Sequence, residues 1–299
     1  MTSQGVPLAV NGILRPQQWV DALQMRSDHP EATTICGGTD VMVGINFDQI
    51  RPTTLLDLSR LGELQTWELS GRTIRLGAGL TYTRIINELA AELPGLALAA
   101  RTVGSPQVRN AGTVGGNLGT ASPAGDSHPP LLASRAEVEV ESIRGSRLIP
   151  IDDFFVGPKR NALEDDELIR AVHIPVATGP QQFAKIGQRN AMVIATASFA
   201  LSIDVVGRRA GTGIGSAGPT PLRVVSGEAL VEDALSGRWE SPGPLDYDLA
   251  DEFGRLVAEA ASPIDDVRAT ADYRRHTLSV LGRRLLQWVW VDLMKGGLE

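Results

Sequence analysis

The chain has 299 residues, enough for two or three domains with hydrophobic cores of their own. Its net charge of −7 argues against the basic surface that marks nucleic-acid-binding proteins, so small molecules and other proteins are the expected partners. The single cysteine, Cys36, excludes an intrachain disulfide and an iron–sulfur cluster ligated by cysteines of this chain alone. Neither a signal peptide nor an apolar stretch of ~20 residues is found, so we expect a cytoplasmic protein without a membrane span.

The first 60 residues predict a helix followed by two buried strands. Apolar residues, among them Trp19 and Leu23, recur at helical spacing over residues 16–26. Short β-like runs cover residues 33–36 and 54–58, and the first of them leads directly into the sequence GGTD. The sequence pattern changes near residue 60, which indicates the end of a first domain, residues 1–59.

Residues 60–176 predict a second domain that mixes strands and helices. Strands are expected over residues 73–77, 137–141 and 167–174, and residues 137–141 alternate as they do when one face is wet. A helix is expected over residues 81–91, capped by Thr81 with Ile85 and Leu89 inward, and another over residues 95–101.

Residues 177–299 predict a β-meander followed by helices. The strands are expected at residues 183–186, at residues 193–206 and after the turn at Gly207, and the helices cover residues 249–260 and 278–288. The sequence GTGIGSAG from Gly211 resembles a dinucleotide-binding fingerprint, but two prolines follow where a helix would be needed, so we interpret it as a strand and turn. Three pairs of arginines, at residues 208–209, 274–275 and 283–284, are expected on solvated faces.

Two glycine pairs carry the functional signal. The stretch TVGGNLGTASPAGD, residues 113–126, combines adjacent glycines with small polar side chains and ends at Asp126, which can accept hydrogen bonds from sugar hydroxyls. Alone it could equally be an ordinary glycine-rich loop. The GGTD segment lies 78 residues upstream, counted from Gly37 to Gly115, and two such loops could close on the pyrophosphate of FAD without a helix dipole.

Several segments together resemble the FAD-binding medium subunit of the molybdenum hydroxylases, the family of xanthine dehydrogenase and carbon monoxide dehydrogenase. They read ICGGTDV from Ile35, PQVRNAGTVGGN from Pro106, ASPAGD from Ala121, FAKIGQR from Phe183, GPTPLR from Gly218 and DVRATADYR from Asp266. The resemblance implies an α+β fold of the PCMH type, with two FAD-binding subdomains followed by a three-stranded antiparallel sheet with helices.

The resemblance also implies the residues that bind the cofactor. The first pyrophosphate segment would comprise Thr34, Ile35, Cys36, Gly37, Gly38, Thr39, Asp40 and Val41. The second would comprise Thr113, Val114, Gly115, Gly116 and Asn117, with hydrogen bonds added by Thr120 and Ser122. Asp126 would meet the ribityl or ribose hydroxyls, Val103 and Ile169 would flank the adenine, and Lys185 would reach the flavin. Neither a catalytic residue nor a metal ligand is expected.

As a medium subunit, the chain would relay electrons to NAD⁺ or another acceptor. The resemblance implies a large subunit with a molybdenum cofactor, a small subunit with [2Fe–2S] clusters and a dimer of heterotrimers. A purine or another N-heterocycle is the first expectation for the substrate, before carbon monoxide or an aldehyde.

Some features depart from the family pattern or leave a choice. Val103 stands where an aromatic residue can stack in relatives, and Cys36 is either a small buried strand residue or a redox-active thiol. Arg189 and Met192 match positions that line the flavin cavity in some relatives, or are a surface arginine and a core methionine. The alternative function is a stand-alone FAD-dependent oxidase, with flavin tethered covalently through His128 or Cys36.

Overall fold

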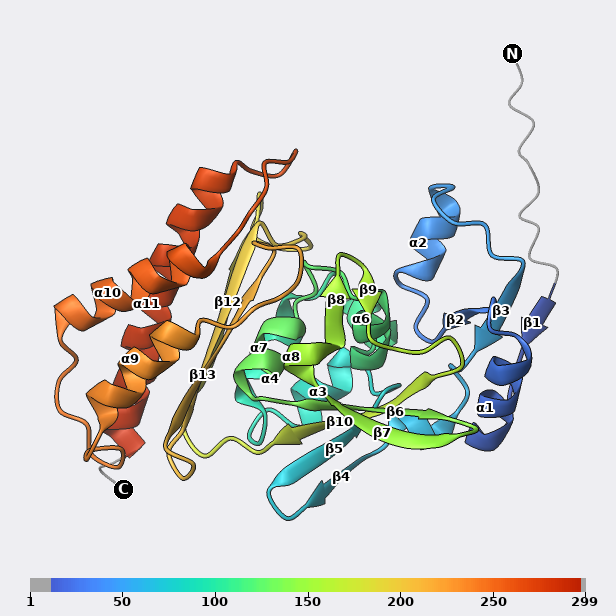
Figure 1. The fold of residues 1–299 in the computed structure, drawn as a ribbon, viewed down its shortest axis with the longest axis horizontal. Helices are drawn as coiled ribbons and strands as arrows, with labels where there is room; N and C mark the ends of the chain where they lie inside the picture. Colours follow the sequence, from blue (N-terminus) through green and yellow to red (C-terminus); the bar gives the residue numbers. More distant parts are fainter. Residues whose placement is uncertain (1–11, 297–299) are drawn as a thin grey trace.

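A computed structural model describes residues 12–296 of the chain. Figure 1 shows three parts in a row, with the middle part between the N-terminal part and the C-terminal sheet and its helices. The N-terminal part consists of β1 (Gly12–Leu14), α1 (Trp19–Asp28), β2 (Thr33–Ile35), α2 (Val41–Asn46) and β3 (Thr54–Asp57). Its three strands are parallel in the order β1-β3-β2, and Thr33 of β2 lies opposite Leu55 of β3. The predicted helix and both predicted strands are confirmed.

The middle part is built on a five-stranded antiparallel sheet of order β4-β5-β10-β6-β7. The strands are β4 (Trp67–Ser70), β5 (Thr73–Gly77), β6 (Glu137–Ser142), β7 (Gly145–Pro150) and β10 (Leu168–Pro175), and β8 (Phe155–Gly157) and β9 (Arg160–Asn161) form a separate hairpin. The helices are η1 (Gly62–Gln65), α3 (Tyr82–Glu88), α4 (Pro94–Thr102), α5 (Pro106–Ala111), α6 (Val114–Thr120), α7 (His128–Ala133) and α8 (Ile151–Phe154). Ile85 and Leu89 are fully buried, as predicted.

The N-terminal and middle parts share one hydrophobic core, which runs from Trp19 to Ile174. Trp19 of α1 is buried in it, and its indole Nε1 donates to Glu141 of β6 over 2.8 Å. The boundary expected near residue 60 therefore separates two sheets that are packed on a common core.

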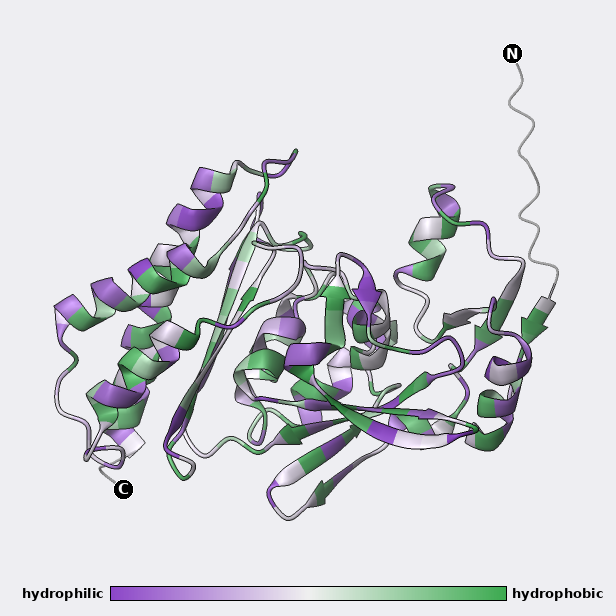
Figure 2. Ribbon diagram, in the orientation of Figure 1, coloured by the Kyte–Doolittle hydropathy of each residue, from purple (hydrophilic) through white to green (hydrophobic). Residues whose placement is uncertain are grey.

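The C-terminal part is an antiparallel meander covered on one face by helices. Its strands are β11 (Gln181–Ile186), β12 (Ala197–Asp204) and β13 (Arg209–Gly215), and its helices are α9 (Val225–Leu235), α10 (Tyr247–Ala260) and α11 (Ala271–Gly296). Figure 2 shows hydrophobic and hydrophilic residues alternating along α10 and α11, as expected of helices with one buried face. The meander is confirmed, whereas α9 was not predicted.

Glycines on β13 allow the middle part to pack against the other face of this sheet. A Cβ atom on Gly211 would lie 1.9 Å from the carbonyl oxygen of Ala133, and one on Gly213 would lie 2.1 Å from that of Pro129. Both carbonyls belong to α7, which contacts β13 along its length. The glycines that resemble a dinucleotide fingerprint therefore serve close packing between a helix and a strand.

Two predictions about the C-terminal part are wrong. The strand expected from residue 193 begins only at Ala197, because Met192 has a positive φ of 51° and the chain turns there before it pairs. Arg274 was expected on a solvated face but is only 1% exposed. Its guanidinium donates to the carbonyl oxygens of Thr196 and Ser216 and to Asp266, and these acceptors offset the cost of its burial.

Candidate functional site

The two glycine segments lie side by side. A Cβ atom on Gly37 would lie 1.9 Å from the carbonyl oxygen of Ala111, so only glycine permits this approach. The hydroxyl of Thr120, at the end of α6, donates to the carboxylate of Asp40 over 3.1 Å. Segments about eighty residues apart in sequence thus form one surface.

The expectation that both segments are loops outside helices is wrong. The second segment contains the helix α6, which follows the helix α5, and the first segment leads directly into α2. Thr113 caps α6 with its side chain, which accepts from the backbone N–H of Gly116 over 2.9 Å. The N–H of Gly115 donates to the carbonyl oxygen of Ala78 over 3.0 Å, so both glycine N–H groups have protein acceptors.

The first segment is different, because its N–H groups are left free. Within residues 12–296, no protein acceptor bonds the five successive backbone N–H groups from Gly37 to Val41. Such a run of donors is suited to an anion. The positive φ of Gly38, 70°, produces the turn that makes this run possible.

A cavity of about 760 Å³ opens between the two segments, within the size range of small-molecule sites. Seventeen of the nineteen expected cofactor-binding residues line it: Thr34, Ile35, Cys36, Gly37, Gly38, Thr39, Asp40, Val41, Val103, Thr113, Gly115, Gly116, Asn117, Thr120, Ser122, Asp126 and Ile169. The two exceptions are Val114, which is fully buried in the core, and Lys185. Met192 lines the cavity, whereas Arg189 does not and instead donates to the carbonyl oxygen of Met192.

Lys185 forms an ion pair with Asp126 instead of pointing into the cavity. Its Nζ atom lies 2.5 Å from Oδ2 of Asp126, and both side chains are 9% exposed. The same Nζ donates to the carbonyl oxygens of Thr102 and Val193, so all three of its protons have acceptors. Burial raises the pKa of Asp126 above its ordinary value, while the Lys185 ammonium and the Thr102 hydroxyl oppose the shift.

One carboxylate oxygen of Asp126 remains available. Oδ1 is buried and has no hydrogen-bond partner within residues 12–296, although Asp126 lines the cavity. Buried polar atoms are rarely left without a partner, so a donor from a bound molecule fits this position.

Other residues of the cavity were missed from the sequence. They include Arg26, Tyr82, Leu163, Glu167, Leu168 and Ile194. Only the end of α1 and the strand β2 separate Arg26 from the run of residues 37–41, so its closeness in sequence could have identified it. The others come from elements whose position depends on the tertiary fold, and no local pattern marks them.

Cys36 and His128 bear on the expectation of a covalent flavin. Cys36 follows the end of β2, is half-buried and lines the cavity; burial raises the pKa of its thiol, which disfavours the reactive thiolate. His128 is fully buried outside the cavity, with its ring 4.6 Å from that of Phe155. Burial lowers its pKa to about 4, so the imidazole is neutral. His128 is therefore not placed to tether a ligand in this cavity.

The described part of the chain has neither a helix able to cross a membrane nor a cluster of three metal-ligating side chains.

Comparisons with known proteins agree with this architecture. Residues 8–177 match the family model "FAD binding domain in molybdopterin dehydrogenase", and residues 182–289 match "CO dehydrogenase flavoprotein C-terminal domain". The chain is 31% identical over 281 residues to a nicotine 6-hydroxylase medium subunit of Paenarthrobacter nicotinovorans, covering 91% of this chain and 94% of that one. It is 29% identical over 277 residues to a putative xanthine dehydrogenase FAD-binding subunit of Escherichia coli, with 89% and 91% covered.

Solved structures show the same fold. A chain of the carbon monoxide dehydrogenase from Oligotropha carboxidovorans superposes with a TM-score of 0.85 at 25% identity, covering 94% of this chain and 98% of that chain. Quinoline 2-oxidoreductase from Pseudomonas putida gives a TM-score of 0.85 at 22% identity, with 95% and 98% covered. The fold, the paired glycine segments and the two family matches identify the chain as a member of the molybdenum hydroxylase family, in which it belongs to the FAD-binding medium subunits.

Proposed function

We propose that the cavity binds one FAD, with its diphosphate on the free N–H groups of residues 37–41. This run of unpaired donors is the observation that carries the proposal. Gly116 forms part of the facing wall, and a Cβ atom there would lie 3.1 Å from the capping hydroxyl oxygen of Thr113, so a larger side chain would crowd the cap and the cavity. The cavity volume and the unpartnered Oδ1 of Asp126 also suit the cofactor.

The flavin is proposed to lie at the end of the cavity next to Asp126. There Oδ1 of Asp126 would accept a hydrogen bond, and Met192, Val193 and Ile194 would cover the ring. Val103 lies beside Thr102, which bonds both Lys185 and Asp126, so we now assign Val103 to the flavin end rather than to the adenine. Lys185 would act by holding Asp126 in place.

The proposed role of the chain is to pass electrons between partner subunits and an acceptor. Bound FAD would accept electrons from the [2Fe–2S] clusters of a small subunit and deliver them to NAD⁺ or another acceptor. The single cysteine of the chain agrees with clusters held elsewhere, because a [2Fe–2S] cluster needs four protein ligands.

A large subunit with a molybdenum cofactor would oxidise the substrate, in a dimer of heterotrimers. An N-heterocycle is the substrate class we propose, because relatives of this chain include proteins named for nicotine, nicotinate and caffeine. Other relatives are named for carbon monoxide and glyceraldehyde, which are the alternatives.

The proposal can be tested in two steps. The purified chain should bind FAD and release it intact on acid precipitation, and a chain without affinity for FAD would refute the proposal. NADH added without oxygen should then bleach the oxidised-flavin band if NAD⁺ is the acceptor. Mass spectrometry of the complex isolated from native cells would identify the partner subunits and, through the large subunit, the substrate class.

A further inference from the structure

Arg26 is the one cationic side chain that lines the cavity, as far as residues 12–296 show. It lies in the last turn of α1. Five carboxylates line the same cavity: Asp40, Asp126, Glu164, Asp165 and Glu167. An arginine among acids would normally be paired with one of them.

Arg26 is nevertheless not paired. Its Nη1 donates to the carbonyl oxygen of Ala32 over 2.8 Å, while its Nε is buried and has no acceptor within the described part of the chain. The nearby carboxylates of Glu31, Asp165 and Asp166 act on it only through space, because none forms an ion pair with it. The guanidinium therefore has donors to spare at the cavity wall.

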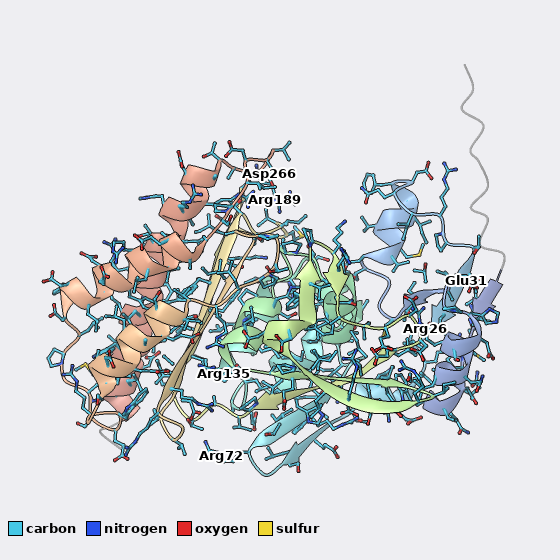
Figure 3. All side chains as sticks on the ribbon, viewed as in Figure 1. Arg26, Glu31, Arg72, Arg135, Arg189 and Asp266 are labelled. Carbon is cyan, nitrogen blue, oxygen red and sulfur yellow. The ribbon has the colours of Figure 1, made fainter. Side chains whose placement is uncertain are left out.

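Arg26 lies at the end of the cavity opposite the Lys185–Asp126 pair. Its acceptor, Ala32, directly precedes β2, and the three residues of β2 alone span about 10 Å before the N–H groups at Gly37 are reached. Figure 3 shows Arg26 beside β2, whereas Arg189, which donates to Met192 of the cavity wall, lies on the other side of the middle part. A diphosphate at Gly37 would thus place the flavin toward Asp126 and the nucleoside toward Arg26.

The nucleoside end has no other flat side chain. Tyr82 is the one aromatic residue lining the cavity within residues 12–296, and it packs against Gly112 in the vicinity of Asp126 and Ser127. Adenine offers a flat ring with acceptor nitrogens, and the planar guanidinium of arginine can both stack on such a ring and donate to it.

We propose that Arg26 binds the adenine of FAD and so selects the dinucleotide over FMN. This inference rests on the proposed FAD function and adds the residue that recognises the adenosine half. Arg26 would be a binding residue without a part in electron transfer.

The test compares FAD, ADP and FMN on the purified full chain. Titration should show that Arg26→Ala weakens FAD and ADP by a similar factor, about 10- to 100-fold, because a hydrogen bond from a charged donor is lost. FMN, which lacks the adenosine half, should bind the variant as it binds the wild type and so reports an intact flavin end. Arg101→Ala is the matched control, since Arg101 is an exposed arginine in the last turn of α4 and does not line the cavity. It should bind all three ligands normally.

Arg26→Lys keeps the charge but loses the planar group. It should bind FAD as weakly as Arg26→Ala, and full recovery would mean that charge acts on the diphosphate, which would overturn the adenine assignment. Unchanged FAD affinity in Arg26→Ala would also overturn it, as would an equal loss of FAD and FMN. A wild-type chain that binds no FAD would instead refute the proposed function.

Discussion

Replacing Lys185 by methionine tests the buried ion pair between the middle and C-terminal parts. The substitution leaves Asp126 at 9% exposure with one hydrogen bond, from Thr102 at 3.3 Å. Removing one partner of a buried pair typically costs about 3–5 kcal/mol. The carboxylate of Asp126 can take up a proton, and the cost of leaving an unpaired charge buried then cannot exceed the cost of this protonation.

The free-energy cost of protonating Asp126 in the variant depends on pH and can be calculated. Protonating a carboxyl group with an ordinary pKa near 3.9 costs about 4 kcal/mol at pH 7 and about 1.5 kcal/mol at pH 5. In the variant the pKa of Asp126 is raised further, so the folded state gains relative stability as the pH falls. The destabilisation caused by Lys185→Met should therefore be smaller at pH 5 than at pH 7, by at most about 2–3 kcal/mol, because the pKa of Asp126 is already raised in the wild type.

Urea unfolding of the FAD-free protein at both pH values measures this difference. The double variant Asp126→Asn/Lys185→Met is the control, because its loss should not depend on pH and should retain only the cost of the unpaired carbonyls of Thr102 and Val193. If Lys185→Met were equally destabilising at pH 5 and pH 7, Asp126 would not be a buried charge that depends on Lys185, and our account of the pair would fail.

Three further predictions concern the cavity and its surroundings. Gly116→Val should weaken FAD by roughly 5- to 150-fold in a titration, from about 1–3 kcal/mol of overpacking, whereas Gly62→Val, outside the cavity, should not. Since the pKa of His128 is lowered to about 4, the wild type should lose about 2 kcal/mol of stability between pH 7 and pH 5 through this residue, and His128→Gln should lack that part of the pH dependence in urea unfolding. Cys36→Ala should still bind FAD, released on acid precipitation; loss of binding, or flavin retained by the wild type after acid, would indicate a covalent role.

Most helices and strands could be predicted because the pattern of buried and exposed residues within each one is visible in its own stretch of sequence. The alternation over residues 137–141 and the inward pair of Ile85 and Leu89 in α3 depend only on which face of an element is buried. The glycine pairs were found for the same reason, since a tight turn or close approach requires glycine at one position. They did not reveal that the second segment is helical, because the helix-breaking tendency of Gly115 and Gly116 hides the capping signal of Thr113.

Burial of charged residues could not be predicted, because it depends on partners from distant elements. Arg274 resembles its exposed neighbour Arg275 in sequence, and only the carbonyls of Thr196 and Ser216 make its burial favourable. Arg26 is a second example, since an arginine near the end of a helix is usually solvated, yet its Nε is buried at the cavity wall.

Lys185 shows how a resemblance can identify a residue while its contacts define what it does. The family pattern assigns it to the flavin, but in the structure each of its three donors already has an acceptor on the protein. To bind a ligand directly it would have to release Asp126 or one of two buried carbonyls, at a cost comparable to the hydrogen bond gained. Its contribution in the structure is to hold Asp126 at the cavity wall and to join β11 to the end of α4 through the carbonyl oxygen of Thr102.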